Sequence, residues 1–143
     1  YACDPKTGAL EYEPAFKKIL REQNIEAVYV CSPTELDYFS RERERLESDL
    51  GLSVFVNPPE ICKIGQDKWE TAQFLERSGF PFPRTAPASD AAAVERLIAY
   101  CGFPLILKPR MGFTSVNVFT VVSLREIQAA LTKSDFRSIL LRL

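Results

Sequence analysis

Histidine is absent from this chain of 143 residues. Its absence excludes, within the chain, Ser-His-Asp and Cys-His nucleophilic sites, and zinc sites of the His-Glu-x-x-His type. Any chemistry in this sequence must therefore use lysine, arginine, carboxylates, hydroxyl groups or backbone amides.

An excess of charge of one sign is also lacking. Lys and Arg together number 18 against 19 Asp and Glu, so the formal net charge is −1. No global field then favours a nucleic acid or a membrane surface. No apolar run approaches the ~20 residues that span a bilayer, and the first ten residues have no apolar signal-peptide core. We expect neither nucleic acid nor membrane as a partner.

Cysteine is present but not in a metal-binding or disulfide-rich pattern. The four cysteines, which include no C-x-x-C pair, are Cys3, Cys31, Cys62 and Cys101. Their spacing is not that of a zinc site, and Cys31 and Cys101 fall at apolar positions typical of buried thiols. We expect a reducing compartment, the cytoplasm.

The first half of the chain predicts alternating helices and strands. Apolar periodicity and β-branched runs place helices at 14–23 and 33–50 and strands at 27–31 and 52–56. Ser32 is the expected cap of the second helix. Strand, helix and strand with short connections predict a parallel pair in a Rossmann-like layer.

The second half predicts a small sheet with helices on one face. Asp67, Ser89 and Ser123 are expected helix caps. Strands are expected at 105–108 and 116–122, with a last strand at the C-terminal "SILLRL". With a boundary near residue 66, the fold class is α/β in 1–66 and α+β in 67–143.

The stretch "LILKPRMGFTS" places two cations in the turn after an apolar strand. Lys108 cannot stay in a core without a counter-ion, so its ammonium must reach water or meet an anion. Arg110 offers a planar fork suited to phosphate, and Gly112 allows unusual backbone angles. Thr114 and Ser115 add hydroxyl donors. Either an exposed hairpin or a phosphate site fits this pattern, and no Walker A or G-x-G-x-x-G motif is present.

Two longer segments resemble one enzyme family. "IGQDKWETAQFLERSGFPFPRT", followed after one helix by "GFPLILKPRMGFTSVNVFTVVS", resembles the ATP-grasp enzymes, and within them the carbamoyl-phosphate-synthase-like branch with its carboxylate–amine ligases. There, a D-K pair opens a helix that ends in G-x-P-x-P, and a later strand leads into K-P-R and a glycine-rich flap. "SPTELDYF" and "LSVFVNPPEICKIGQDK" resemble the Rossmann-like domain that precedes ATP-grasp.

The resemblance implies a division of the chain and a reaction. Residues 1–66 would be part of the pre-ATP-grasp domain, and 67–143 the N-terminal ATP-grasp lobe. The family clasps ATP between two lobes, forms an acyl-phosphate from a carboxylate or bicarbonate, and transfers the acyl group to an amine. Magnesium ions bridge the phosphates.

The resemblance also implies roles for single residues. By position, Lys68 resembles the first phosphate-contacting cation and Lys108 the second. Arg110, Gly112, Thr114 and Ser115 belong to the cofactor-binding turn and flap, and this flap would cover the triphosphate. On its own, Lys68 at a helix start would equally be a solvated residue.

The flap departs from the family pattern, close to K-P-R-x-G-x-G-S-x-G-V. Thr114 and Asn117 replace glycines, and Phe113 takes a normally small position. A bulkier flap approaches phosphates less closely. The adenine hinge and the magnesium ligands are expected beyond Leu143, with no catalytic residue in the chain itself. We expect the chain to be a piece of a longer protein and inactive by itself.

Two other hypotheses stay open at this point. The chain could be a degenerate ATP-grasp module kept as a non-catalytic binding or interaction domain. It could also be a plain Rossmann-like interaction module that uses the charged face "RERERLE". The sequence predicts neither the substrates nor the oligomeric state.

Overall fold

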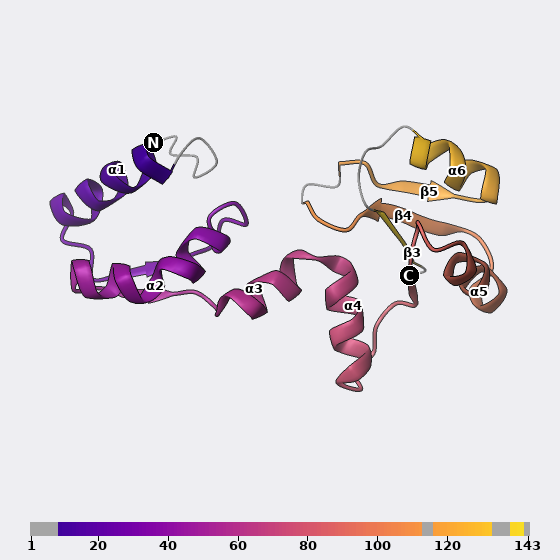
Figure 1. Ribbon diagram of the computed structural model, residues 1–143, viewed down its shortest axis with the longest axis horizontal. Helices are drawn as coiled ribbons and strands as arrows, with labels where there is room; N and C mark the ends of the chain where they lie inside the picture. The colour runs from indigo at the N-terminus through magenta and orange to yellow at the C-terminus, as the bar shows by residue number, and fades with distance from the viewer. Residues whose placement is uncertain (1–8, 113–115, 133–137, 142–143) are drawn as a thin grey trace. The chain divides into compact units, whose positions relative to one another are not determined.

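The computed structural model describes residues 9–112, 116–132 and 138–141. It divides the chain into two compact units, 1–63 and 64–143 (Figure 1). Each unit has its own cluster of buried apolar side chains. Among the described helices, none is both long and apolar enough to cross a membrane.

The first unit is built on a pair of parallel strands. Its elements are α1 (Ala9–Glu22), β1 (Ala27–Tyr29), α2 (Leu36–Leu50), β2 (Ser53–Phe55) and α3 (Pro59–Gln66), the last of which runs on into the second unit. Val28 pairs with Val54, which confirms the predicted parallel pairing. These two valines pack against apolar side chains of both long helices. The opposite face of the strands carries an exposed stacked pair, Tyr29 and Phe55, with ring centroids 4.4 Å apart.

The two ends of helix α2 show one correct prediction and one wrong one. Gly51 ends the helix in the left-handed region at φ 64°, where a side chain would be strained, as predicted. The predicted cap at Ser32 is wrong, because the helix begins at Leu36. The Ser32 hydroxyl instead pairs with that of Thr34 at 2.8 Å, and its carbonyl accepts from the Glu35 amide at 3.0 Å.

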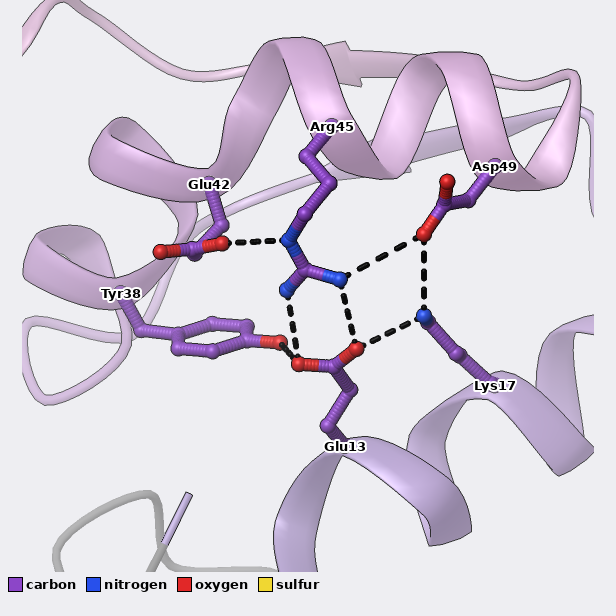
Figure 2. Close-up of polar contacts among 6 residues, drawn as sticks. All are labelled: Glu13, Lys17, Tyr38, Glu42, Arg45 and Asp49. Atoms are coloured by element: carbon purple, nitrogen blue, oxygen red, sulfur yellow. Dashed lines mark hydrogen bonds and ion pairs between the residues drawn. The ribbon is translucent and has the colours of Figure 1, made fainter. Parts of the chain in front are cut away.

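A polar network joins α1 to α2 (Figure 2). The Glu13 carboxylate accepts two hydrogen bonds from the Arg45 guanidinium, at 2.8 and 2.7 Å. It also accepts from the Tyr38 hydroxyl at 2.8 Å and pairs with Lys17 at 2.7 Å. Arg45 donates in addition to Glu42 at 2.6 Å. Two residues of the charged stretch "RERERLE" are thus engaged in this network.

The network shifts the ionisation of its members. Hydrogen bonds from Arg45 and Lys17 hold the pKa of Glu13 far below its usual value. Burial, followed by the bond to Glu13, raises the pKa of Tyr38 to about 12. The carboxylate is therefore ionised, and the phenol neutral, over the whole physiological range.

The second unit is an antiparallel sheet with two helices on one face (Figure 1). Its elements are α4 (Lys68–Arg77), β3 (Thr85–Pro87), α5 (Ala91–Cys101), β4 (Leu105–Pro109), β5 (Phe119–Val121), α6 (Leu124–Thr132) and β6 (Ser138–Leu141). The strand order is β3-β6-β4-β5. Val94 and Leu97 of α5 and Ile127 of α6 pack on Leu105 and Leu107 of β4, which confirms the predicted covering of one face.

Strand β4 divides its side chains between the two faces of the sheet. Leu105 is 0% and Leu107 1% exposed, and both lie in the core beneath the helices. Because successive side chains of a strand alternate, Ile106 and Lys108 lie on the other face. Lys108, which ends the apolar run, is therefore directed away from the helix-covered core.

Two of the three predicted helix caps in this unit are correct, and the third lies one residue further along the chain. Asp67 caps α4 as predicted, by accepting from the Trp69 amide at 2.9 Å. Ser123 caps α6, because its hydroxyl accepts from the Glu126 amide at 3.3 Å. The predicted cap of α5 at Ser89 is wrong: Asp90 accepts from the Ala93 amide at 3.0 Å, while Ser89 lies in the preceding turn.

Candidate phosphate-binding site

The N-terminus of α4 lies against the end of strand β4. The backbone amide of Lys68 donates to the Arg110 carbonyl at 3.0 Å. The Lys68 ammonium donates to the carbonyls of Arg110, at 3.3 Å, and of Gly112, at 2.8 Å. The first residue of the helix thus holds the turn that follows the strand.

A salt bridge reinforces this junction. The Arg110 guanidinium faces the Asp67 carboxylate, with Nε 3.1 Å from Oδ1 and Nη2 2.6 Å from Oδ2. The two side chains are only 20% and 13% exposed. Burial would raise the pKa of Asp67, but the bonds from Arg110 and from the Trp69 amide outweigh it and lower that pKa. Asp67 therefore stays ionised as a fixed partner of Arg110.

Lys108 adds a second positive charge that acts on Lys68. Burial is the main cause that lowers the pKa of Lys68, and the charge of Lys108 is the next. The two ammonium groups are thus close enough to repel each other. In the part of the chain that the structure describes, no carboxylate lies within ion-pair distance of either lysine, whereas Arg110 pairs with Asp67 at 2.6 Å and with Glu70 at 3.6 Å.

The arrangement suits an anion with several oxygens. Two ammonium groups without carboxylate partners among the described residues leave a net positive charge at a partly buried position. Gly112, at φ 111°, adopts a backbone conformation that strains other residues, and space is open beside its Cα. Its backbone can therefore approach a ligand closely. A polyphosphate would offset the repulsion between the lysines.

The structure brings together four of the six residues predicted for this site. Lys68, Lys108, Arg110 and Gly112 meet where α4 adjoins the end of β4. Thr114 and Ser115 lie outside the described residues. The sequence interpretation missed Asp67 as the partner of Arg110. It recognised Asp67 only as a helix cap, and no local signal indicates a contact between residues 43 positions apart.

The described residues contain no cluster of several metal-ligating side chains. Carboxylate oxygens are the usual protein ligands of a magnesium ion. Within 9–112, 116–132 and 138–141, no group of three or more Asp, Glu, Cys or His side chains could hold a metal.

Comparison with known sequences finds relatives that match only part of this chain. No known family profile matches the chain. It is 36% identical over 84 residues to N5-carboxyaminoimidazole ribonucleotide synthase of Synechococcus elongatus, a match that covers 58% of the chain and 21% of that protein. It is 22% identical over 87 residues to the large chain of carbamoyl phosphate synthase of Mycobacterium tuberculosis, covering 61% of the chain and 8% of that protein. The chain therefore spans a small part of these relatives.

Comparison with solved structures extends over nearly the whole chain. N5-carboxyaminoimidazole ribonucleotide synthetase from Thermus thermophilus matches with a TM-score of 0.63 at 21% identity, over 92% of this chain and 33% of that one. The biotin carboxylase domain of 2-oxoglutarate carboxylase from Hydrogenobacter thermophilus, in complex with MgADP, ADP and bicarbonate, matches with a TM-score of 0.63 at 16% identity, over 90% of this chain and 30% of that one. Both are ATP-grasp enzymes, so the resemblance seen in the sequence is confirmed and the chain has the fold of part of an ATP-grasp enzyme.

Proposed function

We propose that this chain is the phosphate-binding part of an ATP-dependent ligase that forms an acyl-phosphate intermediate. The observation that carries the proposal is that the Lys68 ammonium bonds the turn just after Lys108, at the carbonyls of Arg110 and Gly112, and that the charge of Lys108 helps to lower the pKa of Lys68. Two partly buried like charges repel each other unless an anion joins them. The fold shared with ATP-grasp enzymes supports ATP as the source of that anion.

Each part of the site has a distinct task in this proposal. Lys68 and Lys108 contact the phosphates, and Gly112 lets the turn backbone come close to them. Thr114 and Ser115, in the flap, donate to phosphate oxygens. The segment 1–66 is part of a Rossmann-like domain that precedes ATP-grasp, and 67–143 is the N-terminal ATP-grasp lobe.

The proposed substrates are a small carboxylate or bicarbonate together with an amine. Support comes from the similar proteins, one of which was solved with bicarbonate as well as ADP and magnesium. Magnesium is assigned to residues outside those described, and nothing proposed for Lys68 or Lys108 depends on its position.

Titration with ADP and with inorganic tripolyphosphate tests the phosphate role. We expect Lys108→Ala to bind both anions about tenfold more weakly than the parent, since a charge-assisted bond to phosphate is lost. Lys63→Ala, which removes an exposed lysine of α3, is the matched control and should bind like the parent. Equal affinities for the parent and Lys108→Ala would overturn the proposal.

A non-catalytic binding module is the second candidate function. The observation in its favour is the thinned flap, in which Gly112 is the only glycine from 110 to 118. Magnesium-dependent ligase turnover by the full-length protein would exclude this candidate. Tight nucleotide binding without turnover would support it. The 143-residue chain alone is expected to show no turnover, and phosphate release by the purified chain would contradict that.

A further inference from the structure

The salt bridge between Asp67 and Arg110 connects the backbone positions of the two lysines. Asp67 directly precedes Lys68, and Arg110 follows Lys108 by two residues. The structure directs the Arg110 guanidinium to the Asp67 carboxylate, through Nε and Nη2. We propose that Asp67 and Arg110 are a pair of positioning residues that hold the Lys68 ammonium beside that of Lys108. This inference rests on the proposed phosphate-binding function.

Both partners of the pair are fixed at their backbones. Asp67, in an extended conformation at φ −101° and ψ 111°, accepts from the Trp69 amide and so belongs rigidly to the start of α4. Arg110 directly follows strand β4, and its carbonyl accepts from the Lys68 amide at 3.0 Å. A planar guanidinium that bonds both carboxylate oxygens restricts orientation as well as distance. The pair therefore sets the angle at which helix and strand meet.

The pair acts against a repulsion that the site itself creates. The charge of Lys108 disfavours the charged form of Lys68, so the two ammonium groups tend to separate when no anion is bound. The Asp67–Arg110 salt bridge keeps their backbones together in the unliganded protein. An anion then meets a preformed site and does not have to bring the helix and strand together itself.

If Arg110 instead contacts phosphate directly, Asp67→Asn should have the opposite effect on anion binding from the one that the positioning role predicts. If Arg110 bound phosphate, Asp67→Asn would release the guanidinium and remove a negative charge near the anion, and binding would strengthen. If the pair positions the lysines, Asp67→Asn weakens binding. Asparagine keeps an oxygen that can cap α4, so the helix start is preserved in this variant.

Calorimetric titration of the 143-residue chain with inorganic tripolyphosphate tests the inference. The variants are Asp67→Asn, Arg110→Met and the double variant, with Lys108→Ala as the reference for the phosphate role. We expect each single variant to bind about tenfold more weakly, and the double variant no more weakly than either, because both remove one interaction. Arg110→Lys keeps the positive charge but loses the planar guanidinium that bonds both carboxylate oxygens. It should therefore bind tripolyphosphate as weakly as Arg110→Met.

The outcomes separate the two levels of the proposal. Suppose that Lys108→Ala binds tripolyphosphate more weakly than the parent, while Asp67→Asn binds it as tightly as the parent or more tightly. The positioning inference is then wrong and the phosphate site stands. If Lys108→Ala binds like the parent, the phosphate site is wrong and the inference falls with it. Reversible unfolding divides the true dissociation constant by the folded fraction, so the folded fraction of each variant, measured by circular dichroism, corrects its dissociation constant before variants are compared.

Discussion

The Lys68 ammonium donates a hydrogen bond of 2.8 Å to the carbonyl of Gly112, 44 residues further along the chain. This bond ties the first turn of α4 to the turn after β4. A bound phosphate would offer stronger acceptors than these carbonyls. Lys68 thus holds the turn, and in the proposed site it would transfer its bonds to an anion.

Removal of the Lys68 side chain should loosen this junction. In Lys68→Met, we expect the amide of residue 68, which donates to the Arg110 carbonyl, to exchange with solvent about tenfold faster. Hydrogen exchange followed by NMR measures this, with Lys63→Met as the control. Unchanged protection in Lys68→Met would show that the ammonium contributes nothing to the closed turn.

Alkaline pH should reveal the lowered pKa of Lys68. Burial first, and Lys108 second, lower it below the usual 10.5, so in the window just below 10.5 the unfolded chain binds more protons than the folded one. This residue therefore makes the free energy of unfolding rise with pH across that window. The parent should gain stability relative to Lys68→Met as the pH rises toward the usual Lys pKa of 10.5. A constant difference in urea unfolding would contradict the shift.

Acid should remove the contribution of the Glu13 network (Figure 2). Because the folded pKa of Glu13 lies below its usual 4.5, the stabilisation is complete above that value and is lost as the pH falls further. Glu13→Gln should cost about 1 kcal/mol of unfolding free energy near neutral pH, and the difference should shrink in stronger acid. Glu22→Gln, whose carboxylate is 57% exposed and 3.7 Å from Lys18, is the control. A difference independent of pH would contradict the network.

Local sequence patterns predict the elements whose signals are local. Gly51, Asp67 and Ser123 were recognised as helix ends because a left-handed glycine or a capping oxygen acts within four residues. Strand β3 was missed, since Thr85–Pro87 is short and contains a proline. It is a strand only because it pairs with β6, more than fifty residues away.

In the candidate site, too, contacts between residues far apart in the sequence could not be predicted from local patterns. Local patterns placed Lys68 at a helix start and Lys108 at a strand end, and in the structure the charge of Lys108 acts on the pKa of Lys68. The partner of Arg110 could not be predicted, because a guanidinium at a strand end suits a phosphate and a distant carboxylate equally well. Only the tertiary fold selects Asp67.

Lysine side-chain NMR during a tripolyphosphate titration tests the shared anion site most directly. With the Nζ signals assigned by Lys68→Arg and Lys108→Arg, we expect both signals of the parent to shift together, with one midpoint concentration. Such a result means that one polyanion meets both ammonium groups. A shift of only one signal, of neither, or of the two at different midpoints would show that the lysines do not share an anion.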